Sequence, residues 1–246
     1  VIVNDVDAGA ASAVAAGIRA DGGQAIESAA SVATEDGAAQ IIEAAIDGPG
    51  RLDIVINNAG LLRSAPIAEF DISDWNEIVG VGLTGPFLVT RAAWPHMAAQ
   101  GYGRVLMTTS NSGLLGIAGS AAYASAKAGL WGLLRVLSIE GEGVGIRVNG
   151  IAPMAFTAMS TTSKIAPKAW RDGTGDDWSR QLDVNRVSPV AAWLCHESSQ
   201  LSGEVLSAAG GRVALFFMGL THGYANDDLT IEDVRDEIEV VLDTTD

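Results

Sequence analysis

The sequence is poor in cysteine, histidine and basic residues, and each shortage excludes a class of protein. The single cysteine, Cys195, excludes an internal disulfide and is consistent with a reducing, cytoplasmic location. Only three histidines occur, and no ligand spacing surrounds Cys195, so we expect no metal site. Basic residues number 15 against 30 acidic ones, which argues against binding to nucleic acids or anionic membranes. No run reaches the roughly 20 apolar residues of a membrane span.

Apolar residues are plentiful, and they alternate between two patterns along the chain. They make up 48% of the 246 residues, which is enough for a sizeable core. Short β-rich runs alternate with helical stretches of ten or more residues, so we expect an α/β fold with a Rossmann-like, doubly wound parallel sheet. We interpret residues 1–246 as one dinucleotide-binding domain. The expected strands are 1–3, 24–28, 52–56, 103–108, 146–151 and 204–208, and the expected helices are 8–20, 34–46, 73–99, 120–142, 187–196 and 228–242. Pro86 and Pro95 should bend or interrupt the helix 73–99.

Two segments fall outside this alternation. Residues 157–183 are long, polar and irregular, which is typical of a substrate loop or, alternatively, of a plain surface loop. Residues 227–246 form an acidic C-terminal segment in which Val234, Ile238 and Val241 share one stripe of the expected helix. Such a stripe favours packing against a neighbouring subunit, and a solvated helix is the alternative.

Three side chains are placed for proton transfer. Tyr123 and Lys127 lie four residues apart on an expected helix and therefore share one face. Ser110 follows the expected strand 103–108, and open α/β sheets bind ligands at the carboxyl ends of their strands. A phenol has a pKa of about 10, whereas a base working near neutrality needs about 7. An ammonium about 4 Å away supplies the missing 4 kcal/mol or so at an effective dielectric of 20.

Further motifs accompany these residues in order along the chain. Asn57-Asn58-Ala59-Gly60 follows the strand 52–56, and RVNGIAP occupies residues 147–153. With Ser110 and the Tyr123/Lys127 pair, these motifs resemble the short-chain dehydrogenase/reductase family over about residues 1 to 211. WLCHESS (193–199) and the following SGEVLSAAGG resemble one subgroup, the (3R)-hydroxyacyl-CoA dehydrogenase units of multifunctional enzymes.

The resemblance implies a role for each matching residue. Tyr123 would be the general acid/base, Lys127 would lower the pKa of Tyr123 and hold the nicotinamide ribose, and Ser110 would bind the substrate oxygen. The substrate would be a 3-hydroxyacyl-CoA or a steroid-like alcohol, and the protein a homodimer or homotetramer. Further residues are implied to bind the cofactor, namely Ser31, Val32, Asn58, Ala59, Gly60, Ala155 and Thr157.

The cofactor is expected to be NAD. Asp5 ends the first strand, and an acid at that place accepts hydrogen bonds from the adenosine ribose and repels a 2′-phosphate. An NADP-dependent carbonyl reductase is the alternative if Asp5 is only a turn residue. A second alternative is a non-catalytic relic or interaction subunit that no longer binds a cofactor.

Two departures from the family pattern matter. The Gly-rich phosphate turn should precede the acidic residue by about 20 positions, but only four residues precede Asp5. We therefore expect a truncated sequence that lacks the first strand, the Gly-rich turn and the first helix, and a gap in the sheet where that strand would lie. Alignment on residues 82–87 also puts Gly82 where many relatives have an asparagine that supports a proton-relay water.

Overall fold

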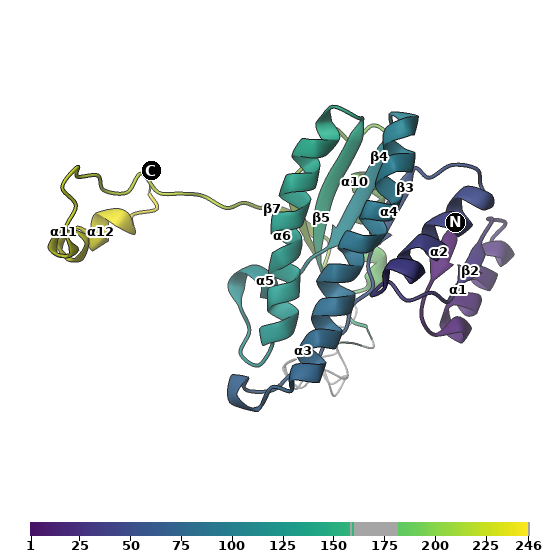
Figure 1. Cartoon of the computed structure of the whole chain (residues 1–246), viewed down its shortest axis with the longest axis horizontal. Coiled ribbons are helices and arrows are strands. Elements are labelled where there is room, and N and C mark those ends of the chain that lie inside the picture. Colours follow the sequence, from purple (N-terminus) through teal and green to yellow (C-terminus); the bar gives the residue numbers. More distant parts are fainter. Residues whose placement is uncertain (158, 160–181, 246) are drawn as a thin grey trace. The chain divides into compact units, whose positions relative to one another are not determined.

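The computed structural model describes residues 1–157, 159 and 182–245, which form two compact units, Val1–Leu215 and Phe216–Asp246. The first unit has the expected α/β architecture (Figure 1). Its elements up to the middle of the chain are β1 (Ile2–Asn4), α1 (Ala8–Ala20), β2 (Ile26–Ser28), α2 (Glu35–Asp47), β3 (Ile54–Asn57), η1 (Ile67–Glu69), α3 (Ile72–Val79), the π-helical turn η2 (Gly80–Thr84), α4 (Gly85–Gln100) and β4 (Gly103–Thr108). The remaining elements are α5 (Ser112–Leu115), α6 (Ala121–Glu142), β5 (Ile146–Met154), η3 (Val184–Arg186), α10 (Ser188–Cys195), β6 (Val205–Ala209) and β7 (Arg212–Phe216).

The strands form two separate sheets. One has five strands in the order β3-β4-β5-β6-β7, and its first four strands are parallel. The other consists of β1 and β2, which are also parallel. Among the described residues, no hydrogen-bonded ladder joins β1 to β3. The expected gap in the sheet is therefore confirmed, and α2 connects the two parts because it packs on both β1 and α4.

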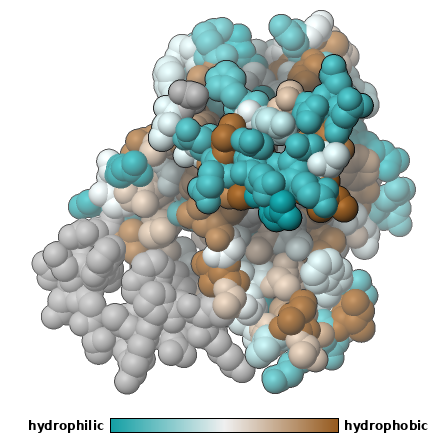
Figure 2. All heavy atoms as spheres, turned by 90° about the vertical axis from the view of Figure 1, so that its left-hand side faces the viewer, coloured by the Kyte–Doolittle hydropathy of each residue, from teal (hydrophilic) through white to brown (hydrophobic). Residues whose placement is uncertain are grey.

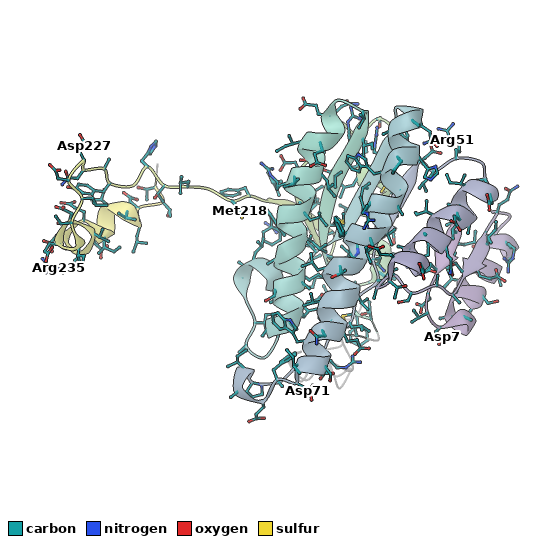
Figure 3. All side chains as sticks on the ribbon, in the orientation of Figure 1. Asp7, Arg51, Asp71, Met218, Asp227 and Arg235 are labelled. Carbon is teal, nitrogen blue, oxygen red and sulfur yellow. The ribbon has the colours of Figure 1, made fainter. Side chains whose placement is uncertain are left out.

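Short polar side chains cap the N-termini of several helices. The Asp7 carboxylate accepts hydrogen bonds from the backbone N–H groups of Gly9 and Ala10 at the start of α1. Asp71 does the same for Ser73 at the start of α3, and Figure 3 labels both aspartates. Such caps satisfy N–H groups that have no partner within the helix.

Helices cover both faces of the five-stranded sheet. Helices α4 and α6 lie side by side along one face, in front of β4 and β5 in Figure 1. Helix α10 packs against β4 and β5 from the other face, where Leu106 and Ile151 meet Leu194 and Cys195 in one buried cluster. Residues 103–107 of β4 are therefore all buried. This central strand leads directly to Ser110.

The expected helix 73–99 is one continuous run of helical residues, 72–100, whose middle turn is π-helical. The chain turns through the π-helical η2 between α3 and α4. Pro86 lies in the first turn of α4, where its missing N–H costs nothing, and Pro95 lies inside that helix. The prolines are compatible with α4, and the irregularity falls at the glycines before them. The expected long helix is therefore confirmed, and its irregular turn lies at Gly80–Thr84, just before the interruption expected at Pro86.

One strand was not predicted from the sequence, because the last expected strand ended at residue 208. Strand β7 follows β6 after Gly210 and Gly211, whose φ angles are +57° and +86°. Two successive glycines in the left-handed region are typical of a two-residue hairpin turn. The segment 157–183 lies almost entirely outside the described residues, so its expected role as a substrate loop stays a prediction.

The second unit contains two short helices, α11 (Ile231–Asp236) and α12 (Ile238–Val241), instead of the single helix expected over 228–242. Thr230 and Asp233 form a reciprocal capping box at the start of α11. Large apolar side chains remain exposed, among them Leu220 at 98% and Ile231 at 85%. Brown and teal residues are interspersed on the face shown in Figure 2. In the described part of the chain, no helix has both the length and the apolar character needed to cross a bilayer.

Candidate active site

Ser110 is held at the carboxyl end of β4 by the neighbouring strand. The N–H and the hydroxyl of Thr109 both donate to the carbonyl of Ile151 on β5, at 2.7 and 3.0 Å. The Ser110 hydroxyl accepts a hydrogen bond of 3.2 Å from the N–H of Ser112, which begins α5. The serine therefore sits at the sheet edge where ligands of open α/β folds bind.

A glycine brings the segment after Ser110 onto α6. A Cβ atom at Gly113 would lie 2.7 Å from the Ala128 nitrogen and 2.9 Å from the Lys127 carbonyl carbon. Only glycine permits this approach, because real Cβ atoms essentially never come so near to backbone atoms. Ser110 in turn hydrogen-bonds to the phenol of Tyr123 on α6. The structure thus brings Ser110 and Tyr123 together, as the sequence predicted.

The pKa of Tyr123 is displaced in the direction opposite to the one expected from Lys127. Burial of the phenol raises its pKa above 10.0, and the hydrogen bond with Ser110 only partly opposes this effect. The Lys127 Nζ lies 5.7 Å from the centroid of the Tyr123 ring and donates to the Thr108 carbonyl at 2.6 Å. The ammonium is therefore directed at a backbone carbonyl of β4 and does not lower the pKa of the phenol by direct contact.

Lys127 itself is a buried cation. Its exposed fraction is 3%, and no carboxylate pairs with it in the described part of the chain. Burial lowers its pKa to about 8, because removal from water disfavours the charged form. A lysine held in this way retains most of its charge at neutral pH and has N–H groups to spare for a polar ligand.

The segment after β3 borders the same site. The Asn57 amide donates to the Thr90 hydroxyl at 3.1 Å, which fixes the end of β3 to α4. The Thr108 hydroxyl donates to the side-chain amide oxygen of Asn58 at 3.1 Å. A Cβ atom at Gly60 would lie 3.7 Å from the Lys127 Nζ. Asn58 and Gly60 are therefore close to the Ser110, Tyr123 and Lys127 group, and Ala59 lies between them.

The predicted adenosine-binding residues lie at the ends of β1 and β2. Asp5 is exposed, and its Oδ1 atom accepts a hydrogen bond of 2.9 Å from the Asp7 N–H. Ser31 accepts a hydrogen bond from the Ala33 N–H. Val32 packs on α4, because a Cβ atom at Gly85 would lie 2.9 Å from its Cγ2 atom. Asp5 thus shapes a turn, and a role in cofactor binding stays a prediction for all three residues.

Ala155 and Thr157 follow the carboxyl end of β5, next to the edge that carries Ser110. The Phe156 N–H between them donates to the carbonyl of Leu182 at 2.8 Å. Buried Asn149 fastens β5 to the chain before β6, since its amide donates to the Leu201 carbonyl at 2.8 Å. The place of Ala155 and Thr157 in the fold is compatible with the role that the resemblance implies for them.

Sequence reasoning missed three contributors to this site. The Thr108 carbonyl receives Lys127, and Gly113 allows α5 to approach α6. The side-chain oxygen of Asn111 is buried and has no hydrogen-bond partner among the described residues. Asn111 directly follows Ser110, so this acceptor points to a polar ligand. Proximity to Ser110 was the signal that would have found Thr108 and Asn111.

The sequence profile of the short chain dehydrogenase family matches residues 1–169. The chain belongs to this family. The family assignment confirms that the protein is an oxidoreductase enzyme, and it places the Ser110, Tyr123 and Lys127 group in a fold that uses NAD or NADP.

Similar proteins extend this result over nearly the whole chain. The mouse "Peroxisomal multifunctional enzyme type 2" is 38% identical over 256 residues, covering 99% of this chain and 33% of that protein. The "3-oxoacyl-[acyl-carrier-protein] reductase" of Synechocystis is 37% identical over 202 residues, covering 79% of this chain and 81% of that protein. The solved full-length multifunctional enzyme type 2 from Drosophila melanogaster superposes with a TM-score of 0.79 at 33% identity, over 99% of this chain and 41% of that one. This chain spans about a third of the length of the mouse enzyme.

Proposed function

We propose that the chain interconverts a secondary alcohol and a ketone with NAD, on a 3-hydroxyacyl-CoA or a steroid-like substrate. The convergence of Ser110, Tyr123 and buried Lys127 at one sheet edge is the observation that carries this proposal. The name of the Synechocystis relative, a 3-oxoacyl-[acyl-carrier-protein] reductase, supports an acyl thioester substrate. The alternative of a non-catalytic relic is not favoured, because all three side chains are retained in contact with one another or with β4.

Tyr123 would transfer the proton of the reaction. In ketone reduction its O–H donates to the substrate oxygen, and in alcohol oxidation its oxygen accepts the hydroxyl proton. Burial keeps this phenol protonated, so the site at rest is prepared to act as an acid. The Ser110 hydroxyl would hold the substrate oxygen within reach of Tyr123. When bound, the cofactor would supply or accept the hydride of the reaction.

The residues present fit the nicotinamide end of the cofactor. Lys127 has N–H groups beyond the one that donates to Thr108, and these would bind the ribose hydroxyls. Asn58, Ala59 and Gly60 leave room beside the Lys127 ammonium. At the adenosine end, Asp5 would accept from the ribose, and this role favours NAD over NADP. The sequence contains no Gly-rich turn ahead of Asp5 to hold the pyrophosphate.

A soluble homo-oligomer in a reducing compartment such as the cytoplasm is part of the same proposal. Cys195 is a buried free thiol, which is consistent with reducing conditions. Exposed apolar residues on α4 and α6, including Phe87, Val136 and Ile139, favour contact with a second copy.

The direct test is a titration of the purified 246-residue chain with NADH, followed by the fluorescence of the nicotinamide. Saturable binding, then NADH-dependent reduction of a 3-oxoacyl-CoA that is lost in Tyr123→Phe, would support the proposal. A folded chain that binds neither NADH nor NADPH would contradict it. Weaker NADH binding by Asp5→Ala, with NADPH binding unchanged or improved, would support the preference for NAD.

A further inference from the structure

Three arginines line the end of the sheet opposite to Ser110. Arg104 and Arg147 lie near the starts of β4 and β5, whose other ends lead to the candidate active site. Arg135 reaches the same region from α6, where it donates to the Gly203 carbonyl at 2.9 Å. We call these three residues the arginine cluster.

Two members of the cluster are forced together by the register of the sheet. Arg104 on β4 pairs directly with Arg147 on β5. Neighbouring strands are only about 4.8 Å apart, so the two side chains leave the sheet close to one another. Arg104 is 4% exposed, so water screens its charge poorly. Two like charges in this arrangement repel each other unless an anion lies nearby.

No acidic side chain in the described part of the chain forms an ion pair with the arginine cluster. The guanidinium groups donate mainly to backbone carbonyls instead. Arg104 donates to the carbonyls of Gly103 and Glu197, and Arg147 donates to the carbonyl of Ser199 and the side chain of Gln200. The Nε atom of Arg104 is buried and has no partner among the described residues. An unsatisfied buried donor is costly, and it adds to the cost of burying the Arg104 charge.

The arginine cluster lines a hollow of about 700 Å³ at this end of the sheet. Two carboxylates, Glu142 and Glu204, line it as well, so the lining residues carry three positive charges and two negative ones. A volume of this size accommodates a small metabolite. The chain as a whole has a net charge of −15, which makes a local excess of arginine here the more unusual.

We propose that this hollow binds a phosphate-type oxyanion, carried by a small phosphorylated molecule, between Arg104, Arg135 and Arg147. Guanidinium groups present paired N–H donors that match phosphate oxygens. Such a ligand would neutralise the repulsion between the paired arginines. The site is distinct from the Ser110, Tyr123 and Lys127 group and does not depend on the function proposed for it.

The test uses the full chain with inorganic phosphate as the probe. Calorimetric titration and thermal unfolding would be measured with phosphate, and with chloride at equal ionic strength. We expect saturable binding of phosphate that weakens about tenfold in Arg147→Gln and in Arg135→Gln. Arg51→Gln removes the same charge from an exposed arginine that pairs with Asp53. This control variant should bind phosphate with the affinity of the wild type. Arg104 is left intact because its loss would endanger the fold.

Two further arms sharpen the outcome. Glu142→Gln removes a negative charge from the lining and should tighten phosphate binding. Glycerol phosphate that binds more tightly than inorganic phosphate would indicate a phosphorylated metabolite, and equal affinity would indicate the free ion; both results support an oxyanion site. Equal affinities in the wild type, Arg147→Gln and Arg135→Gln, or no binding at all, would overturn the proposal.

Discussion

The two sheets of the first unit contain the same kind of strand but differ in how well that strand is covered. In β4, residues 103–107 are all buried between α4 and α6 on one face and α10 on the other. In β1 and β2 no residue is buried, and Ile26 is 46% exposed. On β3, at the open edge of the five-stranded sheet, Ile54 and Ile56 are 44% and 53% exposed.

The difference shows that a β-rich run gains its stability from its neighbours. Strand β4 has a partner on each side and helices on both faces, so nearly all its apolar surface leaves water. Strand β1 has only β2 beside it, and an isolated pair of strands is marginal in water. Ser110, Tyr123 and Lys127, for which proton transfer is proposed, depend on the covered sheet. The three residues proposed to bind the adenosine end, Asp5, Ser31 and Val32, depend on the open one.

The largest expected effect is the loss of turnover in Tyr123→Phe. The phenol is the only hydroxyl proposed to exchange the substrate proton, so we expect turnover to fall about 1,000-fold. Stability should change by less than about 1 kcal/mol, because the ring remains packed. Tyr224→Phe makes the same change in the second unit and should leave turnover unaltered. Equal turnover of the wild type and Tyr123→Phe would show that the covered sheet does not carry the chemistry.

The second prediction compares the two regions by the cost of losing an apolar side chain. Leu134 on α6 has an exposed fraction of 0%, so Leu134→Ala should lower the free energy of unfolding by about 3 kcal/mol. Ile26 lies on β2 and is 46% exposed, so Ile26→Ala should cost less than about 1 kcal/mol. Urea denaturation measures both. Similar costs at the two positions would mean that β2 is covered as well as α6.

The sequence predicted most elements of the five-stranded sheet and its covering helices, and much of the β1-β2 sheet. The strand at 103–108 and the helix at 8–20 have the predicted bounds, because capping and periodicity are local signals. The Ser110 and Tyr123 contact was predicted from their motif. Gly113 was not, because only the approach of α5 to α6 gives that glycine a role. The raised pKa of Tyr123 was also missed, since burial depends on the packing of the whole fold.

Strand β7 and the π-helical turn within the helix 73–99 were missed for different reasons. Gly210 and Gly211 before an apolar run are a local hairpin signal, so β7 was within reach of the sequence. The π-helical turn Gly80–Thr84 has no comparable signal, because glycine alone does not distinguish such a turn from a weak helix.

The third prediction concerns the burial of a charge in the covered region. Lys127 has a pKa of about 8 in the fold and about 10.4 when unfolded, so the protonated form destabilises the fold below pH 8. Lys127→Met removes this penalty but loses the hydrogen bond to Thr108, and we expect it to be about 2 kcal/mol more stable at pH 7.

The stability advantage of Lys127→Met should shrink as the pH rises from 8 towards 10.5. In this range Lys127 of the wild type loses its proton in the folded state but keeps it in the unfolded state, so raising the pH stabilises the wild type. Urea denaturation of both proteins at pH 7 and pH 9.5 measures the trend. A stability difference that is the same at both pH values would show that Lys127 is not held as a buried cation.

The smallest expected effect comes from Gly82, which lies in the π-helical turn beside α6. A Cβ atom there would lie 3.3 Å from the Ala126 Cβ, so the two helices must separate by a few tenths of an ångström to admit a side chain. Asparagine is a slightly better helix former than glycine, and we expect Gly82→Asn to change stability by less than about 1 kcal/mol. If the absent amide limits proton exchange at Tyr123, turnover should rise severalfold, whereas Gly82→Ala, which adds the same Cβ without an amide, should leave turnover unchanged. Equal turnover in both variants would mean that proton exchange at Tyr123 does not need an amide at this turn. Catalysis by the residues of the five-stranded sheet and its helices would then need no side-chain amide at position 82.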